Sequence, residues 1–282
     1  MKKILCLVTA LMMCVMFAAC GEKAKTPSED TNKDAGTAKT SYDNLGIVCE
    51  LTSEEYGIAF RKGSDLTDEV NTLIDELTDD GTLKDLASKY KLTLADIKSP
   101  QKTEATVKDI DYIKGKGKMV IGITEYEPMN YKDENGKWTG FDTEFAEAVC
   151  AKLGVTAEFI EIDWDNKFLA LESKSIDCIW NGMTISEEVL NNTSCTKAYV
   201  KNAQVVVMAK DKIKNYKTPE SMADLKFAVE AGSAGASAAE ENGFSNTVEA
   251  GTQTDALLEV ASGSSDACII DLTMANAMLG IK

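Results

Sequence analysis

From residue 45 onward, short apolar runs alternate with stretches whose apolar residues recur every three or four positions. Short apolar runs are typical of buried strands, and the longer spacing is typical of helices with one buried face. The helical spacing is clear within residues 65–77, at Leu66, Val70, Leu73, Ile74 and Leu77. Alternating strands and helices predict an α/β fold with largely parallel sheets flanked by helices.

The pattern predicts the following elements. Strands are expected at 45–51, 58–60, 119–123, 155–162, 176–180, 204–208, 227–230 and 267–270. Helices are expected at 65–77, 83–90, 106–113, 142–153, 167–171, 256–261 and 273–278, with one more after Ser233. Gly81 and Gly154 are expected to end helices. The elements fall into two runs divided near 205–208, which suggests two lobes.

The first residues have the pattern of a targeting segment. Two lysines precede the apolar run ILCLVTALMMCVMF, and two alanines stand directly before Cys20. This arrangement resembles a lipoprotein signal over residues 1–19, which implies a lipid on Cys20 and an anchor on the extracellular face of the cell membrane. A plain signal peptide or a short membrane helix is the alternative, but the run is short for a span of about 20 residues. Residues 20–40 lack large apolar side chains, which predicts a disordered tether.

The composition limits the partners and the chemistry. The net charge is −16 and the isoelectric point is near 4.5, which argues against nucleic acid and anionic lipid headgroups as partners. The chain has no histidine, which excludes serine-triad, cysteine–histidine and histidine-ligated metal sites. The five cysteines after Cys20 lack CxxC spacing and predict neither a zinc site nor a disulfide framework. We therefore expect no metal and no cofactor.

Four segments identify a family. They are IGITEYEPMNY followed by GKWTGFD, then IDCIWNGMTIS, KFAVEAGSAG and SSDACIID. With these segments the chain resembles the amino-acid-type extracellular solute-binding proteins of ABC importers. The resemblance extends over nearly all of the chain from residue 41. It implies the type II periplasmic-binding-protein fold, with two lobes of mostly parallel sheet flanked by helices.

The family's segments stand here in an unusual order. Residues 56–92 resemble the closing segment of the family, yet they precede residues 118–149, which resemble its opening segment. The stretch that would follow MLGIK in the family is similar to residues 41–60. We interpret this order as a circular permutation. The alternative is that residues 41–100 derive from a neighbouring duplicated gene.

The permuted order implies a division into lobes joined by two hinge crossings. Lobe 1 is expected at 55–206, with the permutation joint at about 96–105, and lobe 2 at 41–54 plus 207–282.

The resemblance also implies the ligand contacts. A free amino acid needs acceptors for its ammonium group, donors for its carboxylate and a shaped pocket for its side chain. Asp271 would accept from the ammonium group, and Tyr126 and Trp164 would sandwich the ligand. The first N–H groups of the helix after Ser233 suit a carboxylate. The full set implied is Tyr126, Trp164, Asn181, Gly182, Thr184, Ser233, Ala234 and Asp271.

These residues also have purely structural interpretations. Asp271 would cap the helix at 273–278, and Ser233 would cap the helix that follows it. Tyr126 and Trp164 would be ordinary packing residues.

One position departs from the family. The NGMTIT motif is usually followed by an arginine that clamps the ligand carboxylate, but here the run is NGMTISEEVLNN, with Val189 in that place. The only arginine of the chain, Arg61, lies in the FRKGSD segment and is expected to serve elsewhere. Either the helix amides, Thr184 and a lysine such as Lys167 hold the carboxylate, or the ligand has no ordinary α-carboxylate.

The expected function is the capture of a small polar solute, most simply an amino acid, by closure of the two lobes, and its delivery to an ABC permease. We expect a lipid-anchored monomer. The alternative is a ligand-binding sensor that signals to a membrane receptor. An enzyme on the same fold is disfavoured because the chain has neither histidine nor an activated nucleophile. A rearranged product that does not fold is a further alternative.

Overall fold

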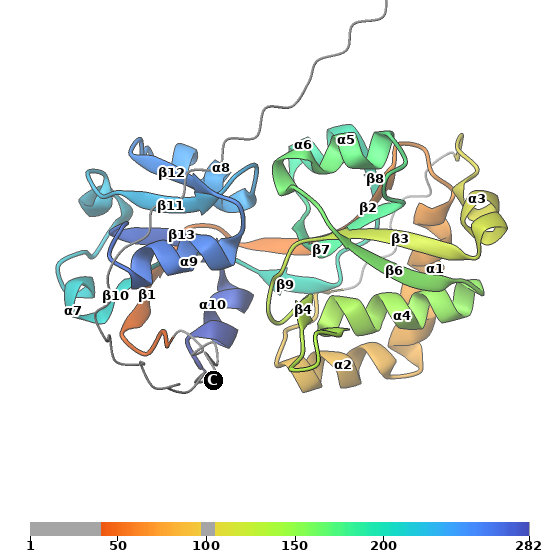
Figure 1. The fold of residues 1–282 in the computed structure, drawn as a ribbon, viewed down its shortest axis with the longest axis horizontal. Coiled ribbons are helices and arrows are strands. Elements are labelled where there is room, and N and C mark those ends of the chain that lie inside the picture. The colour runs from red at the N-terminus through yellow and green to blue at the C-terminus, as the bar shows by residue number, and fades with distance from the viewer. Residues whose placement is uncertain (1–40, 97–104, 282) are drawn as a thin grey trace, which may run out of the picture. The chain divides into compact units, whose positions relative to one another are not determined.

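Two β-sheets and the helices on their faces make up the fold (Figure 1). The computed structural model describes residues 41–96 and 105–281. The predicted signal segment at 1–19, Cys20 and the tether to residue 40 lie outside these residues, as does most of the predicted joint at 96–105. Within the described part of the chain, no helix combines the length and the apolar character needed to cross a membrane.

The larger sheet has the strand order β6-β3-β7-β2-β8, with β9 also paired to β2. β3 runs parallel to β6 and β7, whereas β2 runs antiparallel to β7, β8 and β9. The strands are β2 (Glu54–Arg61), β3 (Lys118–Ile123), β6 (Thr156–Glu161), β7 (Cys178–Thr184), β8 (Thr193–Cys195) and β9 (Val200–Asn202).

The smaller sheet has the order β1-β10-β13-β11-β12. β11 is parallel to β12 and β13, and β10 is antiparallel to β1 and β13. The strands are β1 (Leu45–Glu50), β10 (Gln204–Ala209), β11 (Phe227–Glu230), β12 (Thr247–Ala250) and β13 (Ala267–Asp271). A separate hairpin joins β4 (Tyr131–Lys132) to β5 (Trp138–Thr139).

The predicted α/β class is confirmed, but both sheets are mixed rather than mostly parallel. The chain passes directly from β1 to β2 and from β9 to β10, with no crossover helix in between. Each entering strand starts at the end where the parallel strands finish, as the pairing of Tyr56 with Thr184 shows. It therefore runs antiparallel to its neighbours, since a parallel arrangement needs a long return connection.

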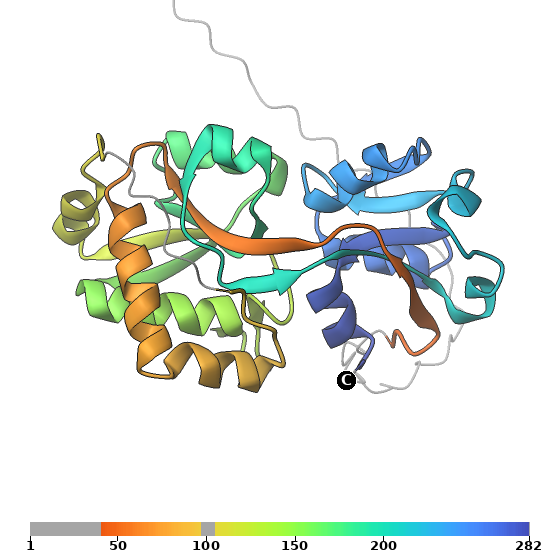
Figure 2. The ribbon, with the colours of Figure 1, turned by 180° about the vertical axis from the view of Figure 1, so that it is seen from behind.

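The two crossings lie next to each other, β2 in orange and β9 to β10 in green-blue (Figure 2). Leu51 N–H donates to the Gln204 carbonyl oxygen at 2.8 Å, and Gln204 N–H donates to Thr52 Oγ1 at 3.0 Å. β10 pairs with β1 and β13 from Gln204 onward. The second crossing therefore ends before Gln204, earlier than the boundary at 206–207 that the sequence suggested.

The predicted helices are present. Two of them have an end that is shifted by three residues, and the others agree within two residues. The helix expected at 106–113 occupies Asp109–Lys116, and the one expected at 256–261 begins at Gln253, where the Thr252 hydroxyl accepts from Asp255 N–H. The helices are α1 (Leu66–Asp79), α2 (Thr82–Tyr90), α3 (Asp109–Lys116), α4 (Phe141–Leu153), α5 (Lys167–Glu172), α6 (Glu187–Asn192), α7 (Lys210–Ile213), α8 (Ala234–Glu241), α9 (Gln253–Ala261) and α10 (Leu272–Met278), with short 3₁₀ turns at Trp164–Asn166 and Pro219–Met222.

The apolar face predicted for α1 is the face that packs inward. Leu66, Val70, Leu73, Ile74 and Leu77 are all buried. α1 contacts α2, α4 and β2, so the helices before residue 92 cover the larger sheet together with α4.

Arg61, the last residue of β2, binds Asp109 at the start of α3 and Asp177 directly before β7. Its Nη2 lies 2.8 Å from Asp109 Oδ1 and 3.4 Å from Asp177 Oδ1, and Nη1 donates to the Ile176 carbonyl oxygen at 2.8 Å. Lys116 also pairs with Asp177, at 2.6 Å. Arg61 is buried, as are both aspartates. The guanidinium is therefore a structural group, in line with the expectation that it serves outside the ligand site.

Candidate functional site

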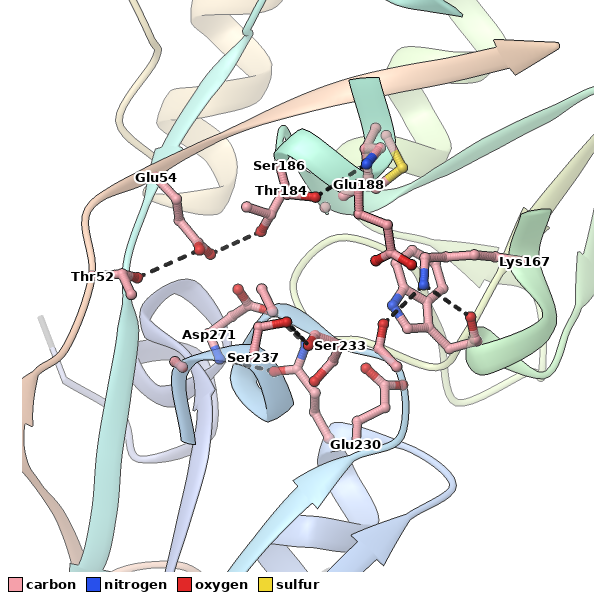
Figure 3. Close-up of a pocket in the computed structure, with 18 of the residues that line it drawn as sticks. Thr52, Glu54, Lys167, Thr184, Ser186, Glu188, Glu230, Ser233, Ser237 and Asp271 are labelled. Carbon is pink, nitrogen blue, oxygen red and sulfur yellow. Dashed lines mark hydrogen bonds between the residues drawn. The ribbon is translucent and has the colours of Figure 1, made fainter. Parts of the chain in front are cut away.

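A cavity of about 150 Å³ lies where the carboxyl ends of β7, β11 and β13 meet the crossing before β2 (Figure 3). Carboxyl ends of parallel strands are the usual place for ligands in α/β sheets. Of the residues predicted to contact the ligand, those that line this cavity are Trp164, Asn181, Gly182, Thr184, Ser233, Ala234 and Asp271. The structure thus brings together side chains from both sheets.

Tyr126, the remaining predicted contact, lies behind the cavity wall and not in its lining. Its ring packs against Gly182, where an added Cβ atom would stand 2.7 Å from the ring; Gly182 also has a φ of +56°. The Tyr126 hydroxyl bonds to the Tyr56 hydroxyl at 2.6 Å and to the Thr273 hydroxyl. Tyr126 is buried, and it supports the cavity wall from behind.

The end of β7 presents a polar edge to the cavity. The Asn181 side chain is hydrogen-bonded to the Thr124 backbone. Its Oδ1 accepts from Thr124 N–H at 3.0 Å, and its Nδ2 donates to the Thr124 carbonyl oxygen at 3.0 Å. Thr184 donates its hydroxyl to Glu54 Oε1 at 2.9 Å. Asn181 therefore fixes the wall, and Thr184 belongs to the network of acidic groups at the crossing.

Asp271 and Glu54 form an acidic pair held by amide side chains. Gln204 Nε2 donates to Glu54 Oε1 and to Asp271 Oδ1, each at 2.8 Å. Asn202 donates to the same two carboxyl groups, and Gln253 donates to Asp271. Burial, followed by the nearby charge of Glu54, raises the pKa of Asp271 to about 7. Asp271 precedes α10 but makes no side-chain capping bond, so the helix-cap interpretation does not describe it.

Glu230, at the end of β11, is a second buried carboxyl group in the lining. It is only 2% exposed, and its Oε1 has no hydrogen-bond partner among the described residues. Burial, followed by the charge of Asp271, raises the pKa of Glu230 to about 8. The nearby Lys167 is directed elsewhere: its ammonium group donates to the carbonyl oxygens of Gly232 at 2.8 Å and Trp164 at 3.3 Å.

The lining as a whole is strongly acidic. Lys167 is the single lysine or arginine among the described lining residues, and burial lowers its pKa. The carboxyl groups of the lining are Glu54, Glu188, Glu230, Glu241 and Asp271. Burial disfavours the ionised forms of Glu230 and Asp271, and the charge of a neighbouring carboxylate disfavours them further.

The N-terminus of α8 supplies hydrogen-bond donors to the same cavity. The Ser233 hydroxyl accepts from Ala236 N–H at 3.2 Å, so the capping interpretation of Ser233 is correct. Ser233 and Ala234 also line the cavity. The first backbone N–H groups of a helix have no intrahelical acceptor, and they suit a negatively charged group.

The place of the expected arginine is apolar. Val189 lines the cavity from α6 and is buried, whereas Arg61 is absent from the lining. Trp164 forms a further apolar surface, with the Lys167 ammonium nitrogen 5.4 Å from the centre of its ring.

The acidic partners Glu54 and Glu230 were not predicted from the sequence. Both had a weak signal there: Glu230 is the last residue of the predicted strand at 227–230, and Glu54 stands at a predicted hinge crossing. Neither signal indicates that a third carboxyl group, Asp271, lies beside them in the fold.

We expect the stability of the ligand-free protein to fall as the pH rises from about 5 to 8. Asp271 and Glu230, with pKa values of about 7 and 8, and Asp142, which burial brings to about 7, are all raised above ordinary values near 4. A raised folded-state pKa adds stability below the unfolded-state value and loses it as the pH passes the folded-state value. The loss should exceed about 2 kcal/mol.

Thermal unfolding at stepped pH measures this change. The E230Q variant should show a shallower loss than the parent, and E240Q, an exposed change outside the cavity, should leave the slope unchanged. A rise in stability over the same range would contradict the expectation.

The chain is similar in sequence to known bacterial proteins. Residues 119–273 match the profile of the bacterial extracellular solute-binding proteins, family 3. The L-cystine-binding protein TcyJ of Escherichia coli is 29% identical over 121 residues, which are 43% of this chain and 46% of that protein. The arginine-binding extracellular protein ArtP of Bacillus subtilis is 31% identical over 165 residues, 56% of this chain and 62% of that protein. The matches thus span less than two thirds of these relatives.

A solved structure is also similar to this chain in fold. The arginine-bound form of truncated ArgBP from T. maritima has a TM-score of 0.58 at 32% identity, over 60% of this chain and 81% of that chain. The profile match covers more than half of the chain and includes β7, β11 and β13, the strands whose ends line the cavity. This protein therefore belongs to the bacterial extracellular solute-binding proteins, family 3.

Proposed function

We propose that the protein is the substrate-binding component of an ABC importer and that its ligand is an amino acid. The observation that carries this proposal is the cavity itself. The buried carboxyl groups of Asp271 and Glu230 and the N-terminus of α8 line it from the smaller sheet, and Trp164 and the end of β7 line it from the larger sheet. Relatives named for binding cystine and arginine support it.

The two ends of an amino acid have matching groups in the cavity. Asp271, with Glu54 beside it, would accept from the α-ammonium group in charge-assisted hydrogen bonds. The first N–H groups of α8, near Ala234, would bind the α-carboxylate. The Thr184 hydroxyl would be a further donor once it turned away from Glu54 Oε1. Trp164 would pack against the ligand. This arrangement holds the carboxylate without an arginine, since Val189 occupies that place.

We further propose that the two sheets belong to two lobes that close on the ligand, as ligand contacts to both lobes favour the closed state. The larger sheet uses strands from 54 to 202, and the smaller one uses strands from 45 to 50 and from 204 to 271. That division supports the circular permutation, because both sheets are complete only when the segment 41–92 is included.

The proposed location, lipid anchor and monomeric state rest on the sequence. We propose an extracellular, monomeric protein anchored by a lipid on Cys20, which passes its ligand to a membrane permease. Binding without chemistry is favoured because the chain has no histidine and burial raises the pKa of the Cys150 and Cys195 thiols to about 12.

A thermal-shift screen of the common amino acids and cystine tests the proposed function. A ligand at 100 times its dissociation constant should add about 2.7 kcal/mol of stability. The matched α-amides, which lack the carboxylate charge, should give a smaller shift. Stabilisation by sugars, peptides or simple amines, but by no amino acid, would sink the proposal.

A further inference from the structure

Glu230 faces the cavity with one carboxyl oxygen, Oε1, that has no hydrogen-bond partner among the described residues. The residue is nine-tenths or more buried. Its carboxyl group is directed into the cavity (Figure 3). A buried carboxyl oxygen without a partner is costly, and its position in the lining allows a ligand to supply the missing donor.

The charge of Lys167 favours the ionised form of Glu230, but burial outweighs it. Lys167 makes no ion pair within 4 Å in the described structure and directs its ammonium group to the carbonyl oxygens of Gly232 and Trp164. Gln253 contacts both Asp271 and Glu230, but it is a neutral donor and brings no positive charge. Every other charged group of the lining is a carboxyl group, on β13, α6, α8 and the first residue of β2.

Glu230 and Asp271 are separate binding groups on one edge of the sheet. They lie at the carboxyl ends of neighbouring parallel strands, since β11 pairs with β13. Asp271 is surrounded by amide donors, whereas Glu230 has an unused oxygen. A ligand with one ammonium group would satisfy the first carboxyl group and leave this oxygen of the second one without a partner.

We propose that the ligand carries a second cationic group, which pairs with Glu230, so that the cavity selects a dibasic amino acid. This inference rests on the proposed function for the α-amino and α-carboxylate ends of the ligand. The second cation also offsets the excess of carboxyl groups in the lining. Glu188, which faces the same space from α6, adds to the attraction.

Ligands of matched shape separate the charge from the size of the side chain. Arginine and citrulline differ in the guanidinium charge, lysine and Nε-acetyl-lysine differ in the ε-ammonium charge, and agmatine is arginine without the carboxylate. Isothermal titration of the purified protein at pH 8 should show arginine, lysine or ornithine binding at least about tenfold more tightly than the neutral counterparts.

The E230Q variant tests the residue itself. It should lower the affinity for the cationic amino acid at least about tenfold and leave the affinity for its neutral counterpart within about twofold. The control is E240Q, which removes the same charge from the exposed side of α8 and should bind as the parent does. Circular dichroism and thermal unfolding should show that both variants are folded.

The outcomes separate this inference from the proposed function. Equal binding of arginine and citrulline would overturn the requirement for a second cation, since Glu230 would then be protonated and would donate to a neutral side chain. The amino-acid proposal would stay intact, because both ligands are amino acids. Binding of agmatine but of no amino acid would keep the second cation and overturn the amino-acid proposal. Loss of all affinity in E230Q, for neutral and cationic ligands alike, would show a structural role and overturn the assignment, as would a lack of response to every cation in the panel.

Discussion

Replacing Arg61 by alanine should lower the free energy of unfolding by about 3–5 kcal/mol, the usual cost of removing one partner from a buried ion pair. The change leaves Asp109 and Asp177 buried with fewer partners, and it removes the hydrogen bonds to the carbonyl oxygens of Leu171 and Ile176. Lysine should not restore the loss, because a single ammonium group cannot reach both carboxylates and both carbonyl oxygens in the same geometry. Equilibrium unfolding in urea measures the difference.

An exposed pair in the same sheet is the control for Arg61. Lys118 and Glu158 lie 2.6 Å apart, but both side chains are more than 40% exposed, so K118A should cost less than about 1 kcal/mol. If R61A cost no more than K118A, β2 would not be packed against α3 and β7 as described. The placement of residues 54–61 in the larger sheet, and with it the proposed permutation, would then be wrong.

Replacing Asp271 by asparagine should weaken ligand binding by roughly tenfold to a hundredfold, the effect of losing a hydrogen bond to a charged group. The fold should be retained, because asparagine has nearly the same shape and the change removes a buried carboxyl group that lies beside Glu54. The unliganded variant should also lose less stability than the parent as the pH rises to 8. Titration calorimetry and thermal unfolding measure the two effects.

Asp224 provides the matched control for Asp271. It is exposed and is not part of the cavity lining, so D224N should bind with the parent's affinity. A D271N variant that unfolds like the parent and binds with undiminished affinity would remove Asp271 from the site and would leave the ammonium group of the ligand without its proposed acceptor.

Much of the secondary structure could be predicted because it is encoded locally. The spacing of Leu66, Val70 and Leu73 marks the buried face of α1, and Gly154 is in the left-handed conformation after α4, as expected. Short elements such as β8, β9, β12, α6 and α7 were not predicted, since each is too brief to show a period. The mixed direction of the sheets depends on where the chain crosses, which no local pattern contains.

The site was predicted only in part, and for a related reason. The segments that resemble the family led to Asp271, Thr184 and the start of α8, which line the cavity; their contact with a ligand stays a prediction. Glu54 and Glu230 matter because of what surrounds them, and their neighbours come from strands far apart in the sequence. Tyr126 packs behind the cavity wall against Gly182, and no local pattern distinguishes that position from one in the lining.

The pairing of β1 with β10 has a consequence for the assembly of the chain. The larger sheet needs no strand beyond Asn202, so all of its strands have been synthesised before Gln204 is added. β1, by contrast, is made first and finds its hydrogen-bonding partner only when β10 appears. Contacts between residues far apart in the chain form slowly. Among the paired strands of the smaller sheet, β1 and β10 are the farthest apart in the sequence, and we expect their pairing to form late in folding.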